Sequence, residues 1–345
     1  MRTTTLGVMV ASAALLGLMT STGAQAAEVT FASWGGSYQK AERIAFLDKI
    51  EKKYAIKVVE DSHTGLAAIK TQVLSGTVFW DIVDMSTPDC ERGRKQGLWE
   101  KLDYNVLPNA KDLEPRYKND YWLGFITYST VIAWNKDVKN PPTTWAEFWD
   151  VEKFPGKRAL RSRARDMLEV ALLADGVPID QLYPIDVDRA YKKLEQIRPH
   201  VSVWWTSGGQ TAQMMKDDEV DMMIVWNGRA HNAIQDGANW EYSFNEGNIA
   251  VECLVVPKGA PNREQAMKAL NEFVDAANGA EFTQHIPYGP VNAEAYEGGK
   301  IPPETLRRLP SAPQNLKVQF FMDPDWWSSP DGEAAEARWT SFLQQ

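Results

Sequence analysis

The sequence predicts a soluble, two-lobed α/β protein of 345 residues. Short apolar strands alternate with amphipathic helices, two such α/β units follow one another, and a strand-like segment returns late in the chain. Strands that alternate with helices form mostly parallel sheets with helices on their faces. The late return segment indicates that more than one strand crosses between the two lobes.

The first unit is predicted to start near residue 27. Its elements are, in order, a strand over 29–32, a helix over 38–54, a strand over 57–60, a helix over 66–74, a strand over 81–85 and a strand over 128–134. Ile44, Leu47 and Ile50 recur at helical spacing and give the first of these helices an apolar side. Ligands of such sheets bind beyond the carboxyl ends of the strands, which here means near 34–36 and 84–87.

The second unit follows a segment rich in helix-breaking residues. Two prolines and Thr144, a residue type that caps helices, come after the strand over 128–134, so a helix is expected to begin near Trp145. We place the end of the first lobe near Trp134. The later elements are predicted as a strand over 158–162, a helix over 166–173, a strand over 201–205, a helix over 211–216, a strand over 222–226, the return strand over 252–257 and a helix over 263–277.

The first 26 residues are predicted to be a signal peptide. Arg2 supplies a positive start, 6–19 form a short apolar stretch, and 24–26 (AQA) match a small-x-small cleavage site. The apolar stretch is too short and too rich in Ala and Gly for a membrane-spanning helix. We therefore expect cleavage near Ala26 and a mature protein that is soluble in the periplasm.

Composition and motif content argue against several classes of function. The formal net charge of −9 is unsuited to binding nucleic acid. The four histidines lack the spacing of a metal site, and neither a G-x-S-x-G elbow nor a phosphate-binding glycine loop is present in the sequence. We therefore expect no metal, no cofactor and no catalysis. The 14 Trp residues instead suggest a cleft in which flat rings stack on a ligand.

The two cysteines, Cys90 and Cys253, leave two interpretations open. In an oxidising periplasm they can form a disulfide. A buried free thiol is equally compatible with the strand-like surroundings of Cys253. Their separation in the sequence does not decide between the two.

Six short motifs, found in the expected order along the mature chain, resemble those of one family. They are the residues at 33–36 (SWGG), 79–83 (FWDIV), 142–149 (PTTWAEFW), 154–157 (FPGK), 225–228 (VWNG) and 288–292 (YGPVN). Together they resemble the bacterial periplasmic solute-binding proteins of the spermidine/putrescine type, which serve ATP-driven importers. Each motif is weak by itself, and their order behind a signal peptide makes the resemblance specific.

This resemblance implies a fold and a function. The fold is the periplasmic-binding-protein fold of type II, with lobe 1 over 27–133 and 251–297, lobe 2 over 134–250 and 298–345, and a ligand cleft between them. The lobes are expected to close around a small amine-bearing solute, which a membrane permease of an ABC importer then accepts. We expect the protein to act as a monomer.

The resemblance also implies a set of ligand-binding residues, located mainly at strand ends. They are Trp34, Gly35, Gly36, Ser86, Thr87, Arg163, Trp204, Trp226, Glu252, Tyr288 and Trp327. The two glycines let the backbone approach a ligand closely. For some positions a structural role competes with ligand binding: Ser86 and Thr87 are equally well placed to cap a following helix, and Tyr288 can pack in its turn.

The charged positions determine which ligand is expected. Polyamine binders of this family hold ammonium groups with carboxylates, and Glu252 matches one such acid, whereas Arg163 stands where another acid is expected. An arginine there repels an ammonium and pairs with a carboxylate or phosphate. The ligand is therefore expected to be either a polyamine, with Arg163 turned to solvent or paired with Asp166, or an amino acid-like compound with an amine and a carboxylate. Asp84 is a further acidic candidate near the cleft.

Two rival functions follow from the same sequence. One is a ligand-sensing periplasmic protein that reports to a membrane receptor. A receptor would recognise its closed conformation, as a permease would, so the sequence does not distinguish it from an importer component. A secreted enzyme is the remote alternative, because adjacent acids such as Asp217 and Asp218 are usually solvated surface residues.

Overall fold

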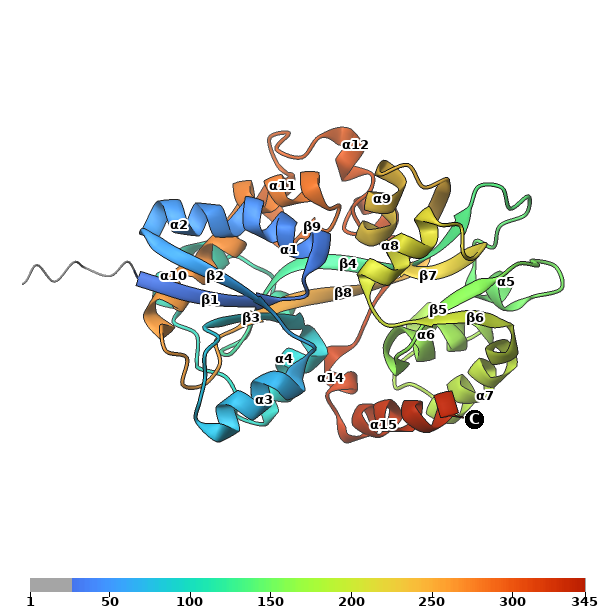
Figure 1. Cartoon of the computed structure of the whole chain (residues 1–345), viewed down its shortest axis with the longest axis horizontal. Helices are drawn as coiled ribbons and strands as arrows, with labels where there is room; N and C mark the ends of the chain where they lie inside the picture. The colour runs from blue at the N-terminus through green and yellow to red at the C-terminus, as the bar shows by residue number, and fades with distance from the viewer. Residues whose placement is uncertain (1–26, 345) are drawn as a thin grey trace, which may run out of the picture.

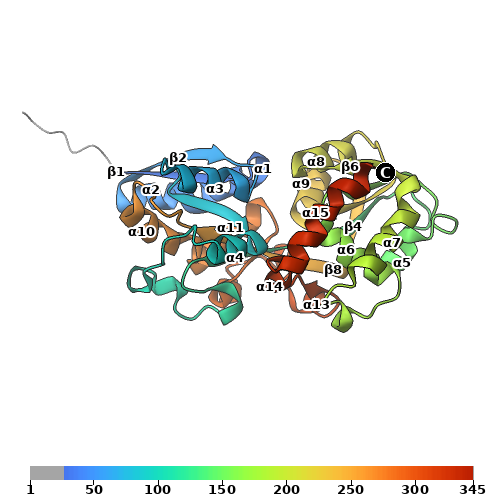
Figure 2. The ribbon, with the colours of Figure 1, turned by 90° about the horizontal axis from the view of Figure 1, so that it is seen from below.

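The computed structural model of the chain describes residues 27–344. The predicted signal peptide over 1–26, with its cleavage site, lies outside the described residues. Figure 1 shows two lobes side by side, and Figure 2 shows the narrow waist between them. Each lobe is a sheet flanked by helices, as the alternation of strands and helices predicts.

The strands join into one mixed sheet in the order β2-β1-β3-β8-β4-β7-β5-β6. Their bounds are β1 Ala27–Ser33, β2 Ile56–Ser62, β3 Ile82–Ser86, β4 Leu123–Asn135, β5 Arg158–Arg161, β6 Val201–Trp205, β7 Met222–Trp226, β8 Trp240–Val255, β9 Gly289–Pro290 and β10 Phe320–Phe321. The pairs β1–β2, β1–β3, β5–β6 and β5–β7 are parallel. Each lobe therefore has a parallel part, which confirms the predicted fold class.

The two long strands connect the lobes. β4 and β8 pair antiparallel with each other along most of their length, from Leu123 opposite Leu254 to Asn135 opposite Trp240. β8 also pairs with β3 of one lobe, and β4 with β7 of the other, so the sheet continues across the waist. The sequence predicts only the last part of β8, because its first half is polar and partly exposed.

The helices cover both faces of the sheet (Figure 1). Their bounds are α1 Gly36–Glu42, α2 Asp48–Tyr54, α3 Leu66–Ser75, α4 Thr87–Lys95, α5 Trp145–Trp149, α6 Ala164–Ala174, α7 Val187–Ile197, α8 Gly208–Lys216, α9 Asn227–Gln235, α10 Arg263–Phe273, α11 Ala276–His285, α12 Pro303–Leu306, α13 Pro313–Leu316, α14 Pro324–Trp327 and α15 Pro330–Gln344. A π turn over Arg43–Leu47 joins α1 to α2, so the helix predicted over 38–54 is continuous. The helix predicted over 263–277 is two helices, because the Asp275 side chain caps the start of α11.

Local signals explain where several helices begin. The Thr144 hydroxyl accepts a hydrogen bond from the Glu147 amide, and the Glu147 carboxylate accepts one from the Thr144 amide, which completes a capping box at α5. α6 has non-helical backbone angles at Arg165 and Asp166, and Asp166 has a φ of 70°. The regular helix therefore begins only after Asp166, and the chain before it turns its arginines toward the waist.

Among the described residues, no helix is both long and apolar enough to cross a membrane.

Candidate functional site

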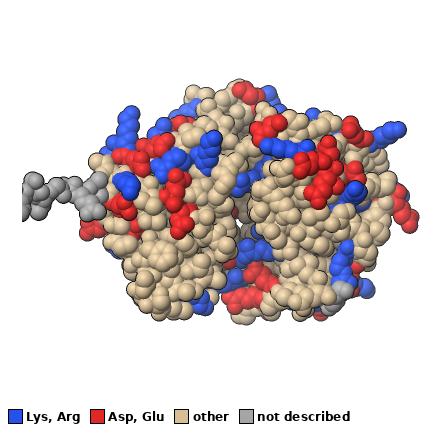
Figure 3. Space-filling view, in the orientation of Figure 1, with Lys and Arg blue, Asp and Glu red and all other residues tan. Residues whose placement is uncertain are grey.

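A cavity of about 340 Å³ lies between the lobes, where strand ends from both lobes converge. Trp34 directly follows β1, Ser86 ends β3, Arg161 ends β5, Trp205 ends β6 and Trp226 ends β7, and all five line the cavity. Figure 3 shows the groove between the two halves, with basic side chains inside it. The cavity thus occupies the place where α/β sheets bind ligands.

Six of the predicted ligand-binding residues line this cavity. They are Trp34, Ser86, Arg163, Trp226, Glu252 and Tyr288. They come from β3, β7, β8 and the segments after β1, β5 and α11, so distant parts of the chain meet at one point.

The other five predicted residues lie outside the cavity lining. The Thr87 hydroxyl donates a hydrogen bond to the Val251 carbonyl at 3.2 Å on the opposite face of β8. Trp204 packs its ring against Trp339, and Trp327 is fully buried with its indole N–H donating to Glu169 at 2.6 Å. Gly35 and Gly36 adopt positive φ at the start of α1 and contribute backbone beside the site rather than to its lining.

Sequence reasoning missed several residues that line the cavity. They include Tyr38, His63, Tyr128, Arg161, Arg165 and Arg229. Arg161 could have been found by the strand-end rule, because it is the last residue of β5. Trp204 and Trp205 project to opposite sides of β6. The alternation of a strand does not show which of the two rings faces the cavity. Arg229 and Tyr128 reach the cavity only through the packing of the two lobes.

Aromatic rings form the back of the cavity. The Trp34 ring lies 4.4 Å from the His63 ring, and the Tyr128 ring lies within 6.1 Å of both Trp226 and Tyr288, measured between centroids. The Arg161 guanidinium sits over the Trp226 ring at 4.9 Å. One face of Trp226 therefore already carries a cation, whereas Trp34 is the better candidate for stacking on an ammonium group of a ligand.

Glu252 supplies a carboxyl group to the same wall. The Trp34 indole N–H donates a hydrogen bond to the Glu252 carboxyl at 3.2 Å. Burial raises the pKa of Glu252 well above its usual value, and the nearby Asp84 raises it further. An ammonium group bound beside Glu252 would favour the ionised form of this carboxyl group, because a nearby positive charge lowers its raised pKa.

Four arginines face the cavity: Arg161, Arg163, Arg165 and Arg229. Arg161 forms an ion pair with Asp166, and Arg165 forms ion pairs with Asp89 and Glu336. Arg163 lies 3.6 Å from carboxylate oxygens of both Asp89 and Glu336, longer than a direct hydrogen bond, and its side chain is 36% exposed.

Arg229 differs from the other three. It donates a hydrogen bond to the Ser37 hydroxyl at 2.9 Å, and no carboxylate of the described chain lies within ion-pair distance of it. The four arginines therefore share three carboxylates, those of Asp89, Asp166 and Glu336. This wall of the cavity keeps a positive charge and suits an anionic group of a ligand.

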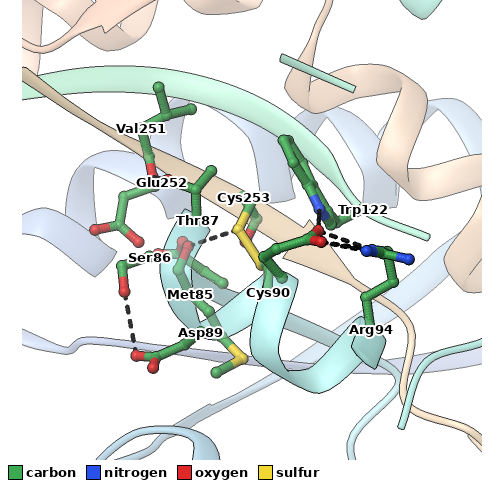
Figure 4. Close-up of a disulfide and its surroundings, with 12 residues drawn as sticks. Met85, Ser86, Thr87, Asp89, Cys90, Arg94, Trp122, Val251, Glu252 and Cys253 are labelled. Atoms are coloured by element: carbon green, nitrogen blue, oxygen red, sulfur yellow. Dashed lines mark hydrogen bonds and ion pairs between the residues drawn. A yellow bond between two sulfur atoms is a disulfide. The ribbon is translucent and has the colours of Figure 1, made fainter. Parts of the chain in front are cut away.

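A disulfide joins Cys90 in α4 to Cys253 in β8, which decides between the two interpretations of these cysteines. Both residues are fully buried. Figure 4 shows the bond on the far side of Thr87 from Ser86 and Glu252. In the β3–β8 ladder Ser86 pairs with Glu252, and Met85 pairs with Cys253. The disulfide therefore fastens the start of α4 to the strand that carries Glu252.

A larger cavity, of about 840 Å³, lies on the other face of β8 beside Thr87 and Val251. The ends of the parallel strands converge on the cavity of Glu252 and not on this one, so we assign the candidate site to the smaller cavity. Within residues 27–344, no group of three or more His, Cys, Asp or Glu side chains is arranged to hold a metal ion.

Comparison with known proteins gives a consistent set of similarities. The family model described as bacterial extracellular solute-binding protein matches residues 45–310. A γ-aminobutyric acid-binding protein of Pseudomonas aeruginosa is 32% identical over 326 residues, which cover 92% of each chain. A spermidine/putrescine-binding periplasmic protein of Salmonella typhimurium is 29% identical over 264 residues, covering 72% of this chain and 74% of that protein.

A solved structure shows the same fold. It is an ABC transporter substrate-binding protein from Bradyrhizobium japonicum, with 49% identity and a TM-score of 0.89. The match covers 92% of this chain and 100% of that one.

Proposed function

Because this chain belongs to the bacterial extracellular solute-binding protein family, as the six motifs predict, we propose that its ligand is a small amine that also carries a carboxylate. The chain is the substrate-binding component of an ABC transporter. The observation that supports this ligand class is one cavity with Glu252 on one wall and arginines on the other. The relative named for γ-aminobutyric acid is a protein whose ligand has both groups.

Charge distinguishes this class from the polyamines. An α,ω-diamine held at Glu252 would place its second ammonium near the arginine wall, where the described residues offer no unpaired carboxylate to receive it. A carboxylate in the same place gains charge-assisted hydrogen bonds from Arg163 or Arg229. The spermidine/putrescine-type ligand implied by the resemblance is therefore the less favoured of the two predicted classes.

Capture is proposed to occur by closure of lobe 1 (27–133 and 251–297) onto lobe 2 (134–250 and 298–345). Contacts across the cavity support this division: Arg229 of α9 donates to Ser37 of α1 at 2.9 Å, and Arg165 of α6 donates to Ser86 of β3 at 2.8 Å. Such contacts can form only when the lobes approach each other. The closed shape is what a permease can recognise.

The cellular setting completes the proposal. Secretion with cleavage near Ala26 places the mature protein in the periplasm, where the disulfide is stable. There the protein acts as a monomer that carries its ligand to the membrane permease and performs no chemistry on it.

A thermal-shift screen of the mature protein tests this function. γ-Aminobutyrate, opine-like conjugates, simple carboxylates, putrescine and spermidine are compared at high concentration. A ligand present at about 100 times its dissociation constant stabilises the protein by about 2.7 kcal/mol. We expect carboxylate-bearing amines to raise the melting temperature. Arg163→Gln should lower their affinity by about 1.5–3 kcal/mol, the contribution of a hydrogen bond to a charged group.

Arg338→Gln is the matched control, because Arg338 lies outside the cavity, where it forms a surface ion pair with Asp188 and packs over the Tyr191 ring. A response to putrescine and spermidine alone would contradict the proposed ligand class. Unchanged affinity in Arg163→Gln would mean that Arg163 does not bind the ligand carboxylate and that Arg229 is the residue to test next.

Replacing the rings tests the placement of the cavity. Trp34→Ala and Trp226→Ala should each weaken ligand binding, by about 0.5–2 kcal/mol where a cation loses its aromatic partner. In Trp226→Ala part of the loss comes from Arg161, which rests on that ring. Titration calorimetry gives the affinity and circular dichroism the folded state. Trp204→Phe, which changes a ring outside the cavity, should bind normally; weakened binding there with none at Trp34 would mean that the cavity has been misassigned.

A further inference from the structure

Three carboxyl groups lie together beneath the aromatic wall of the cavity. Glu42 ends α1, Asp84 lies in β3 and Glu252 lies in β8. Glu42 and Asp84 are fully buried, and Glu252 is 7% exposed. Only Glu252 lines the cavity, so the other two form a layer behind it. We call these three residues the carboxyl cluster.

The hydrogen bonds of Ser33 favour a proton within the cluster. The Ser33 hydroxyl oxygen lies 2.6 Å from a Glu42 carboxyl oxygen and 3.1 Å from an Asp84 carboxyl oxygen. A hydroxyl has one hydrogen to donate. Both contacts are full two-centre hydrogen bonds only if one of the two carboxyl groups carries a proton and donates it to Ser33; with both groups ionised, they would have to share the one hydroxyl hydrogen.

The remaining oxygens give the same indication. Glu42 Oε1 and Asp84 Oδ1 are buried and form no hydrogen bond of ordinary geometry with the described residues, although the Tyr38 hydroxyl lies near the Asp84 carboxyl. Two unpaired carboxylate oxygens in an apolar interior are unfavourable. Protons held between neighbouring carboxyl groups satisfy them.

No cation of the described chain neutralises the cluster. Neither Lys nor Arg forms an ion pair with Glu42, Asp84 or Glu252. His63 donates to the backbone carbonyl of Asp84 at 2.7 Å and not to its carboxyl group, and burial lowers the pKa of His63. The titratable and charged groups that face the cluster from all elements packed against it are Tyr38, Glu60, His63, Asp89, Tyr128, Arg161, Arg229 and Tyr288.

We propose that the carboxyl cluster holds a proton at neutral pH in the free protein, and that the ammonium group of a ligand displaces this proton when it binds at Glu252. The proton passes to solvent, and the positive charge of the ammonium replaces it. Glu42 and Asp84 thus contribute to specificity without touching the ligand. The exchange rests on the proposed function, whereas the stored proton does not.

The exchange has a consequence for ligand selection. A bound cation offsets the free-energy cost of ionising the buried cluster, whereas a neutral or purely anionic ligand does not. Burial raises the pKa of Glu42, Asp84 and Glu252. Because the proton must leave, the affinity for an ammonium ligand should rise with pH below these raised pKa values, by up to about tenfold per pH unit for one proton released.

Infrared spectroscopy of the ligand-free protein tests the stored proton. At pH 7 the carbonyl stretch of a protonated carboxyl group should be present in the wild type and reduced in the Glu42→Gln/Asp84→Asn variant. Glu169→Gln calibrates the signal, because burial raises the pKa of Glu169 to about 7. Asp188→Asn, which removes an exposed carboxylate paired with Arg338, is the negative control. Identical spectra for the wild type and the folded double variant would overturn the proposal.

If the double variant does not fold, carbon-13 NMR of wild-type protein labelled at its carboxyl groups gives the same answer. At least one buried carboxyl carbon, in addition to that of Glu169, that keeps the protonated shift at pH 7 supports the cluster, and none would refute it.

Calorimetry with γ-aminobutyrate tests the exchange. Binding heats should differ between phosphate and Tris buffers, because these buffers take up the released proton with different enthalpies. Equal heats of binding in both buffers would refute the exchange. Absence of binding would count against the proposed ligand class, and the infrared signal would still decide whether the cluster stores a proton.

Discussion

Removing the disulfide between Cys90 and Cys253 is expected to lower the free energy of unfolding by about 5 kcal/mol. The bond closes a loop with a sequence separation of 163 residues, which includes 90–133 of the proposed first lobe and 134–250 of the second. By the chain-entropy relation, a cross-link over so long a loop lowers the conformational entropy of the unfolded chain. At 25 °C this raises the free energy of the unfolded state by about 5 kcal/mol. This equals a large fraction of the stability of an ordinary domain.

Urea unfolding of the Cys90→Ala/Cys253→Ala variant, compared with the wild type, measures this loss. Alanine is used because both positions are fully buried and a serine hydroxyl there would need a partner. The wild type with reductant should resemble the variant only after unfolding, since the bond is inaccessible in the folded protein. A difference below about 1 kcal/mol would show that the β3–β8 ladder already restrains this region in the unfolded chain.

The same substitution should also disturb the ligand site, because Cys253 is adjacent to Glu252 and pairs opposite Met85, the neighbour of Ser86. Ligand affinity measured below the melting temperature separates this local effect from the loss of global stability.

The sequence predicted the fold class well because its strongest signals are local. The helix predicted over 66–74 is observed as Leu66–Ser75, and strands over 201–205 and 222–226 have the predicted bounds. β8 was largely missed, since its polar first half gains its partners from β4, which is more than 100 residues away in the chain. Pairing between distant strands is set by tertiary packing and leaves little trace in local composition.

The candidate site shows the same limit. Trp34, Ser86 and Trp226 could be predicted because they stand at or next to strand ends, and strand ends of α/β sheets meet ligands. Arg229 could not, because its place beside Ser37 depends on how closely two lobes approach. The carboxyl cluster combines Glu42, in a helix, with residues of two strands, and its chemistry exists only once water is excluded.

Asp89→Asn is expected to weaken ligand binding by about 3 kcal/mol, roughly a hundredfold or more in affinity. Asp89 in α4 receives hydrogen bonds from Arg165 of α6 at 2.6 and 3.2 Å, and both side chains are at most 3% exposed. Burial by itself would raise the pKa of Asp89, but the charges of Arg165 and Arg163 hold it well below its usual value. Breaking such a buried pair by neutralising one partner typically costs 3–5 kcal/mol.

The lost free energy should weaken lobe closure and leave the stability of the fold nearly unchanged. Asp89 and Arg165 belong to opposite lobes in the proposed division, so in an open protein Arg165 is hydrated and loses nothing when Asp89 is replaced. The free energy of unfolding of the ligand-free variant should therefore stay within about 1 kcal/mol of the wild type, while its affinity for the ligand found in the thermal screen falls. Small-angle X-ray scattering at saturating ligand should still show the compact form.

A second substitution decides between closure and a simple folding defect. Asp89→Asn/Arg165→Met removes both charges of the buried pair, and Glu336 keeps Arg92 as an ion-pair partner, so part of the lost affinity should return. Asp188→Asn, which removes only the surface partner of Arg338, should change neither quantity by more than about 1 kcal/mol. If Asp89→Asn instead lowers the stability of the ligand-free protein as much as its affinity, the ion pair persists without ligand. The free protein would then already be closed, and binding would have to proceed by transient opening of the lobes.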